Sequence, residues 1–349
     1  MGTAHRVRRN ASQAIGYRRL EAVKGAGSQV PLDHYISQVH LKRFHSPNLS
    51  SRMYAMRKSD LKSFTANSQS VCRIDNGSTN AYLKNDRTIE EFLKKIEPNY
   101  NSVLAKLTEN RIDDECIYTI SGFVAYVLTC SPTAMRVFSE PLKDMVETLA
   151  TAEKFGPMPT SPDELGGASL ADLLQTGRVK IKVDRKYPQA LGIDSILRHV
   201  ATFGNFSWDI LLNRFDQNPF FTSDFPVVIE KTGDWRLTNK VVPLAPNLAV
   251  RIRPNPKIDR KRADLSFANF NYRRRDISHK ELVDINRLIV RCAEDAVFYR
   301  DDSAWVRQFI TRHRHYRIEP SIRKRSTRNG GPVVSVFGLK IAEFPRLPV

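Results

Sequence analysis

The sequence of 349 residues contains few cysteines, and their spacing excludes the scaffolds that cysteine usually builds. No two of them form a Cys-x-x-Cys pair, so a zinc site of the finger type is not expected. A disulfide framework is not expected either, because such frameworks are typical of much shorter secreted domains. We expect reduced, buried thiols and a cytoplasmic protein. The four cysteines are Cys72, Cys116, Cys130 and Cys292.

Long apolar segments are also missing. The N-terminal residues include no apolar stretch of the kind found in secretory signals. The longest mostly apolar run, Ile117 to Cys130, is shorter than the roughly 20 residues that a membrane-spanning helix needs. The sequence therefore predicts a buried helix at this run and no membrane span. Phosphate-binding P-loops, the Gly-x-Gly-x-x-Gly dinucleotide pattern and the His-Glu-x-x-His zinc-protease pattern are absent as well.

Acidic residues are too few to balance the basic ones. The chain carries 55 Lys and Arg against 37 Asp and Glu, a formal net charge of +18. Residues 1–30 hold six Lys or Arg and one Glu, and residues 311–349 hold nine Lys or Arg and two Glu. Such an excess favours polyanions as partners: DNA, RNA or an anionic membrane surface.

The order of the predicted elements indicates an α+β fold. Helical patterns dominate the N-terminal and middle regions, and a mostly antiparallel sheet is expected from residues 219–255 together with a C-terminal strand. We predict three parts: a flexible basic arm over residues 1–30, a single α+β domain over 31–310, and a basic extension over 311–349 that ends in a strand. The oligomeric state is left open.

Local patterns predict individual elements. Residues 52–72 are typical of a strand pair that turns near Lys58. Residues 87–110 are expected to be helical, with Thr88 as the N-cap and a bend at Pro98. Further predictions are a loop at 156–167, helices at 112–152 (broken near Pro132 and Pro141), 170–174, 193–212 and 278–299, and short strands at 227–229, 241–242 and 249–252.

The stretch Leu32–Pro47, LDHYISQVHLKRFHSP, concentrates histidines in an amphipathic run. As a helix it aligns His34, Gln38 and His45, whereas as a strand it aligns His34 and Gln38 with His40. His34 and Gln38 share a face in both cases. We therefore predict His34 as a general acid or base and Gln38 as a residue that orients substrate. The alternative is local packing, which we expect for His40 and His45.

A second candidate lies in NPFFTSDFPVV, residues 218–228. Pro226 favours an extended conformation at Phe225, which holds Asp224 at the mouth of a strand. We predict Asp224 as a metal ligand or a carboxylate that positions water, with an Asx-type turn as the alternative. The acidic-x-lysine pattern of restriction-type nucleases is absent, because Glu230 and Lys231 are adjacent and point to opposite faces of a strand.

Basic residues fill two further stretches, 251–262 and 271–276, and Phe270 and Tyr272 are interleaved with them. This mixture is typical of proteins that bind single-stranded nucleic acid. A solvated surface loop is the alternative. The basic residues predicted to bind are Arg43, Arg251, Arg253, Arg273, Arg274 and Arg275.

Two groups of residues together resemble a large, mainly bacterial family known as domain of unknown function number four-two-three-eight. Its pattern His-Tyr-x-x-Gln-x-x-Leu-x-x-Phe is similar to HYISQVHLKRF, and its Phe-x-Thr-Ser-Asp-x-Pro is similar to FFTSDFP. A Pro-Leu-x-Pro segment and the helix INRLIVRCAEDAVFYR extend the likeness over about residues 33–300. The family often has Arg-Thr-Pro where this chain has Cys130-Ser131-Pro132. The positions that the resemblance implies are His34, Gln38, Phe44, Ser223, Asp224, Pro226 and Asn286.

The resemblance implies a shared fold, and the family's activity is not established. Our leading hypothesis is a protein that acts on nucleic acid as a hydrolase, with Asp224 holding a divalent metal such as Mg²⁺ or Mn²⁺. The alternative is a non-catalytic module that binds nucleic acid or protein through its basic arms. A third hypothesis is an enzyme that acts on a nucleotide or another small anion.

Overall fold

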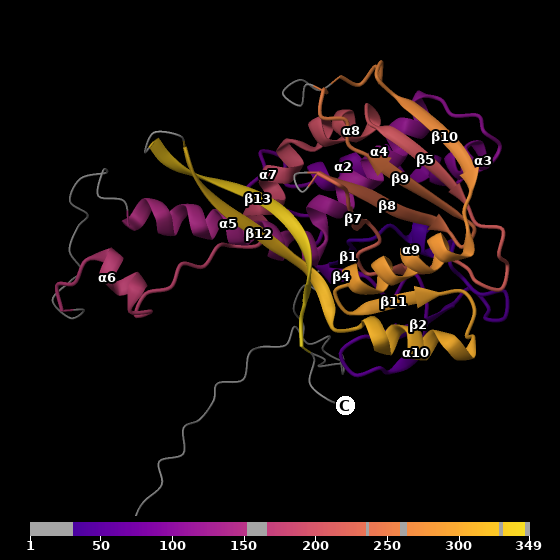
Figure 1. Cartoon of the computed structure of the whole chain (residues 1–349), viewed down its shortest axis with the longest axis horizontal. Helices are drawn as coiled ribbons and strands as arrows, with labels where there is room; N and C mark the ends of the chain where they lie inside the picture. Colours follow the sequence, from indigo (N-terminus) through magenta and orange to yellow (C-terminus); the bar gives the residue numbers. More distant parts are fainter. Residues whose placement is uncertain (1–30, 152–165, 235–236, 259–263, 328–330, 346–349) are drawn as a thin grey trace, which may run out of the picture. The chain divides into compact units, whose positions relative to one another are not determined.

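The computed structural model describes residues 31–151, 166–234, 237–258, 264–327 and 331–345. The predicted arm at 1–30 and most of the predicted loop at 156–167 lie outside the described residues. From Leu32 onwards the chain forms one compact unit, which includes the C-terminal strands (Figure 1).

The first motif folds as a strand followed by a short helix. β1 (Leu32–His34) pairs antiparallel with β4 (Arg73–Asp75), and α1 (Gln38–Lys42) begins four residues later. The prediction of one continuous element was therefore wrong. A bend at residues 35–36 separates the two elements, where the buried Tyr35 and Ile36 enter the core.

A four-stranded sheet, in the order β3-β2-β11-β6, follows from the next segment. β2 and β3 pair antiparallel and turn after Arg57, which confirms the predicted strand pair. β11 lies between β2 and β6, so the TSDFP segment enters this sheet at its edge. The strands are β2 (Met53–Arg57), β3 (Ser63–Ala66), β6 (Thr222–Ser223) and β11 (Ala296–Tyr299).

Helices follow these first strands and occupy most of the chain from Thr88 to Cys130, as predicted. Pro98 lies in the short 3-10 helix η1, which separates α2 from α3. Thr88 is not the N-cap: Arg87 holds that position and the Thr88 hydroxyl donates to the Asn85 carbonyl. The bounds are α2 (Thr88–Leu93), η1 (Glu97–Asn99), α3 (Tyr100–Thr108) and α4 (Asp114–Cys130).

The Cys-Ser-Pro segment ends α4 and starts α5 (Pro132–Thr151). Ser131 adopts an extended conformation because a proline follows it, and Pro132 suits the first helical position. The predicted break at Pro141 was wrong, since this proline lies inside α5. One missing N–H bond is tolerated where the rest of the helix packs against neighbours.

The predicted helix over 193–212 was wrong in its second half. α6 (Leu170–Gln175), α7 (Lys186–Asp194) and α8 (Ile196–Gly204) are followed by β5 (Ser207–Leu212). The β5 segment is buried on both faces, and such a continuous apolar run shows no periodicity that separates strand from helix.

The second sheet has five strands in the order β10-β5-β9-β8-β7. All neighbours pair antiparallel except β10 and β5, which are parallel. The expected strands of 219–255 are thus confirmed, as is the α+β class. The remaining strands are β7 (Val228–Lys231), β8 (Thr238–Ala245), β9 (Leu248–Arg253) and β10 (Asn271–Asp276).

The chain ends in a two-stranded antiparallel sheet that we call the C-terminal ribbon, β12 (Tyr316–Thr327) and β13 (Gly331–Glu343). α9 (His279–Cys292) and α10 (Ala304–His313) precede it. The ribbon runs alongside α5, where Phe337 contacts Phe138 at a ring distance of 5.5 Å (Figure 1). The predicted C-terminal strand is confirmed, and it pairs with β12 rather than with the five-stranded sheet.

Among the described residues, no single helix is long and apolar enough to cross a membrane. α4 and residues 132–149 pass that test only as a pair, bent by 61°. The residues of α4 are mostly buried in the core, as expected for the run from Ile117 to Cys130.

Candidate functional site

His34 and Gln38 lie at the start of the described chain without a shared partner. His34 is half-buried on β1, and burial followed by the charge of Arg73 lowers its pKa, while a hydrogen bond with the Val71 backbone opposes this. Its Nδ1 is buried and has no hydrogen-bond partner. Gln38 is the first residue of α1 and is half-buried. In the described structure, no hydrogen bond joins either side chain to Asp224.

A different histidine connects the two motifs. His40 is fully buried, and its Nδ1 lies 2.8 Å from the Tyr100 hydroxyl while its Nε2 lies 2.9 Å from the Thr222 hydroxyl. The ring stacks on Phe123 at 4.8 Å. Burial lowers the pKa of His40 to about 3, so the imidazole is neutral at physiological pH. Its contacts are those of a histidine that holds the core together.

Sequence reasoning expected only packing for His40 and missed its polar partners. Thr222 stands 182 residues further along the chain. No local sequence pattern predicts a contact between two residues so far apart. The one indication in the sequence is that the motifs containing His40 and Thr222 both resemble the same family. His45, the third histidine of the stretch, is half-buried and its Nε2 has no hydrogen-bond partner.

Asp224 is 2% exposed, and both of its carboxylate oxygens accept backbone hydrogens. Oδ1 accepts from the Glu294 N–H at 2.9 Å, and Oδ2 accepts from Asp295 and Ala296 at 2.8 and 2.9 Å. Burial raises the pKa of Asp224 to about 7, and the backbone N–H donors of Ala296 and Asp295 oppose this rise. The carboxylate thus organises the turn between α9 and β11.

The surroundings of Asp224 offer little to a metal ion. Its two oxygens already have N–H donors, and it is closed off from solvent. Within the described ranges, no group of three or more His, Cys, Asp or Glu side chains is placed to hold a metal. The Asp224 carboxylate is therefore committed to backbone hydrogen bonds in the described structure.

Ser223 and Asn286 support the same segment from inside. The Ser223 hydroxyl accepts the Phe225 N–H at 3.2 Å. The Asn286 amide oxygen accepts the Phe221 N–H at 2.9 Å, and its nitrogen donates to the Pro219 carbonyl at 3.0 Å. Both side chains are buried, so their contacts fix the backbone before β6 and around it.

Four of the predicted binding arginines do gather on one face of the five-stranded sheet. The register places Arg273 opposite Asp209 and Asp209 opposite Arg251. Arg253 and Arg275 stand two residues further along their strands, and alternation puts them on the same face. The fold therefore brings together residues that are separated by up to 24 positions in sequence.

Carboxylates neutralise this group of arginines. Asp209 is 1% exposed on its side chain and pairs with Arg273 at 2.6 Å and with Arg253 at 3.2 Å. Glu281, on α9, pairs with Arg251 at 2.7 Å and with Arg275 at 2.6 Å. The Arg275 and Arg251 hydrogen bonds lower the pKa of Glu281 to about 2. These ion pairs connect β5, β9 and β10 to α9.

The other two predicted binding arginines are exposed. Arg274 points away from that face and donates to the Thr108 carbonyl at 2.8 Å. Arg43 follows the last residue of α1. Neither lies among the carboxylates described above.

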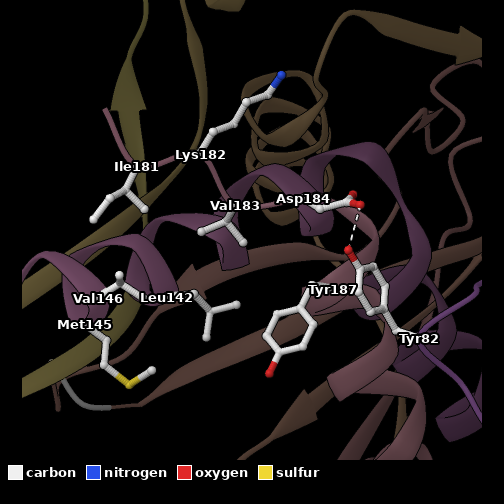
Figure 2. A pocket seen from close by; sticks show the side chains of 9 residues that line it. All are labelled: Tyr82, Leu142, Met145, Val146, Ile181, Lys182, Val183, Asp184 and Tyr187. Atoms are coloured by element: carbon white, nitrogen blue, oxygen red, sulfur yellow. Dashed lines mark hydrogen bonds between the residues drawn. The ribbon is translucent and has the colours of Figure 1, made fainter. Parts of the chain in front are cut away.

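A shallow groove of about 340 Å³ lies where α5 meets the chain before α7 (Figure 2). Its walls are mainly apolar, and Tyr82 and Tyr187 contact each other at a ring distance of 5.5 Å. The Tyr82 hydroxyl donates to Asp184 at 3.0 Å (Figure 2). The lining residues are Tyr82, Leu142, Met145, Val146, Ile181, Lys182, Val183, Asp184 and Tyr187.

Comparison with known proteins was made against families, curated proteins and solved structures. Residues 33–303 match the family described as protein of unknown function (DUF4238). The chain belongs to this family. No curated protein and no solved structure matches it.

The DUF4238 match confirms the resemblance seen in the sequence, and it includes both motifs that His40 and Thr222 connect. It ends at Ser303, before α10 and the C-terminal ribbon. The C-terminal ribbon therefore lies outside the part of the chain that the family match covers.

Proposed function

We propose that this DUF4238 protein binds nucleic acid without cleaving it, and that the C-terminal ribbon is its main contact. The ribbon has strands of 12 and 13 residues and pairs with no other strand in the described structure. At roughly 3.4 Å per residue its length is about 40 Å. The major groove of duplex DNA admits a two-stranded ribbon of this kind.

The charge of the ribbon is the observation that carries this proposal. No acidic residue stands between Glu319 and Glu343, whereas Arg323, Lys324, Arg325, Arg328 and Lys340 all do. A long stretch of positive charge without local carboxylates attracts the phosphate backbone and releases its counterions.

The base of the ribbon is firmly attached to the rest of the protein. Arg136 on α5 donates to the Ile318 carbonyl at 2.8 Å and pairs with Glu294 at 2.8 Å and Glu319 at 3.2 Å. Arg317 also pairs with Glu319. The arginines at the base are thus paired with carboxylates, and the basic residues proposed to contact a partner follow them in the sequence.

Non-catalytic binding is favoured over hydrolysis because of Asp224. The carboxylate expected to hold a metal is buried and serves three backbone N–H groups. The sheet arginines expected to bind substrate are paired with Asp209 and Glu281. These contacts support binding over metal-assisted cleavage.

Fluorescence anisotropy tests the proposal with labelled duplex DNA, single-stranded DNA and RNA of equal length. We expect salt-sensitive binding by the full chain. Replacing Arg323, Lys324 and Arg325 with alanine should weaken binding and reduce the slope of log affinity against log salt by about 3 for duplex DNA. The matched control replaces Arg178, Lys180 and Lys182, which are exposed on another segment, and should change the slope little.

Two results would count against the proposal. One is equal binding by the ribbon variant and the control. The other is cleavage of the labelled substrate in the presence of Mg²⁺ or Mn²⁺ that is lost in Asp224→Asn, which would support the hydrolase hypothesis.

A further inference from the structure

Three arginines lie close enough to His313 to act on its charge, in the region where α9, α10 and the start of β12 pack together. Arg287 and Arg291 are separated by one helical turn on α9, so they share a face of that helix. Arg312 and His313 are the last two residues of α10, and Tyr316 is the first residue of β12. We call Arg287, Arg291 and Arg312 the arginine cluster.

Arg291 is a cation with no acidic partner in the described part of the chain. Its guanidinium lies over the Tyr316 ring, with the Cζ atom 4.3 Å from the ring centroid. Its Nε is buried and has no hydrogen-bond partner, and no ion pair is formed by this side chain among the described residues. A guanidinium that stacks on a ring keeps its in-plane N–H groups available for two oxygens of one ligand.

His313 lies beside the arginine cluster and, like Arg291, has a buried nitrogen without a hydrogen-bond partner. The side chain is 9% exposed, its ring contacts Phe309 edge-on at 5.0 Å, and its Nδ1 has no hydrogen-bond partner. Burial and then the charges of Arg291, Arg287 and Arg312 lower its pKa to about 4. No carboxylate contributes to this shift, so the local positive charge is not compensated at His313.

Other arginines near the start of β12 do have acidic partners, unlike Arg291 and Arg312 in the described structure. Arg136 and Arg317, which also reach the start of β12, are paired with Glu294 and Glu319. Within the cluster, Arg287 pairs with Asp284 at 2.7 Å, but both side chains are 40% exposed, where an ion pair compensates weakly. Arg291 and Arg312 have no such partner in the described structure.

We propose that Arg291, Arg312 and His313 form a phosphate-binding site at the base of the C-terminal ribbon, and that it takes one phosphodiester of a bound nucleic acid. The site deepens the proposed function and rests on it for the source of the phosphate. Arg291 would bind two phosphate oxygens in a bidentate contact, and Arg312 would supply a second positive charge. An anion there would offset the positive charge of the arginines that act on His313.

The test follows the His313 ring by NMR in the full-length protein, with His313→Gln to assign the resonance. The probes are inorganic phosphate and a short oligonucleotide, titrated separately in a chloride buffer. Each probe should raise the pKa of His313, because a bound anion offsets the charges of the arginine cluster. If neither probe moves the pKa, the site is wrong.

Variants show which residues hold the phosphate. Arg291→Ala should weaken phosphate binding about tenfold, as expected for the loss of charge-assisted hydrogen bonds. Arg291→Lys keeps the positive charge but loses the planar guanidinium that can bind two oxygens at once. Its phosphate affinity should therefore lie between those of Arg291→Ala and the wild type. Arg312 is exposed, and Arg312→Ala should weaken binding in a fold that is not disturbed. The matched control is Arg198→Ala, which removes an exposed arginine from α8 and should leave binding unchanged.

The two probes separate this inference from the proposed function. A shift of His313 with phosphate but no binding of the oligonucleotide would keep the site and overturn nucleic acid as its source. Binding of the oligonucleotide that is equally tight in wild type, Arg291→Ala and Arg312→Ala would overturn the site and leave the proposed function standing.

Discussion

At the scale of single residues, His40 shows how a polar side chain can specify a core. Its two ring nitrogens satisfy the Tyr100 and Thr222 hydroxyls, which belong to α3 and β6. Because all three groups are buried, removing the imidazole leaves two hydroxyls without a partner as well as a cavity. The same side chain thus joins segments that are distant in sequence.

His40→Gln should lower the free energy of unfolding by about 2–4 kcal/mol at neutral pH, since an amide cannot reach both hydroxyls and fill the ring's volume. The measurement is urea unfolding. His34→Gln is the matched control, and it should have a smaller effect because His34 makes no side-chain bond to either hydroxyl. Equal losses in the two variants would contradict the role of His40.

The effect of His40→Gln should also depend on pH. Folded His40 stays neutral down to about pH 3, whereas the unfolded chain takes up its proton near 6.5. The unfolded state therefore binds more protons below pH 6.5, and the stability contributed by His40 falls as the pH falls. The difference between wild type and His40→Gln should shrink by up to about 1.4 kcal/mol per pH unit in this range. A difference that stays constant would contradict the low pKa.

At the scale of elements, the turn between α9 and β11 is built around one carboxylate. Asp224 directly follows the edge strand β6 and accepts the N–H groups of three consecutive residues, 294–296. The same turn carries Glu294, which holds Arg136 of α5. Asp224 therefore connects the four-stranded sheet to the base of the C-terminal ribbon.

Asp224→Asn should destabilise the protein by about 2–4 kcal/mol, because the amide nitrogen replaces an acceptor that faces backbone N–H groups. Thermal and urea unfolding measure this loss, with the exposed Asp216→Asn as the control. A variant that is as stable as wild type would mean that the carboxylate is not needed for the turn, and a catalytic role would regain support.

At the scale of the whole molecule, the C-terminal ribbon divides into a structural base and a basic distal part. The Lys58 ammonium, which is fully buried, donates to the Tyr316 carbonyl at 2.7 Å. Phe337, Leu339 and Ile341 pack against the core. The sequence beyond these contacts includes Arg323, Lys324, Arg325 and Arg328.

Shortening the ribbon separates these two parts. Ile322 and Phe337 are opposite each other, so an Asn-Gly turn can join them directly in place of residues 323–336. We expect this variant to keep its melting temperature within a few degrees and to lose most of its nucleic-acid affinity. A chain that ends at His315 should instead be destabilised, since the buried Lys58 ammonium loses the Tyr316 carbonyl and keeps only the Ala293 carbonyl of its two backbone acceptors. Full affinity in the shortened variant would place the binding surface elsewhere.

The sequence predicted many of the residues that the candidate site contains, but few of the contacts that these residues make. The arginines of residues 251–275 were expected to act together, and alternation along paired strands does place four of them on one face. Their carboxylate partners could not be foreseen, because Asp209 lies in a segment that resembles a buried helix and Glu281 lies on α9. Pairing across strands is set by register, which the local pattern does not contain.

The sequence by itself determined the α+β class, the family, the strong positive charge and the elements with a clear period, such as α4 and β2–β3. These features depend on composition and on the order of nearby side chains. Only the tertiary structure decided that His40 rather than His34 reaches the TSDFP segment and that Asp224 serves a turn. It also decided that Arg136 has two acidic partners while Arg291 has none among the described residues. Such differences depend on which distant residues share a buried space, where an unpaired polar group is costly and a paired one is not.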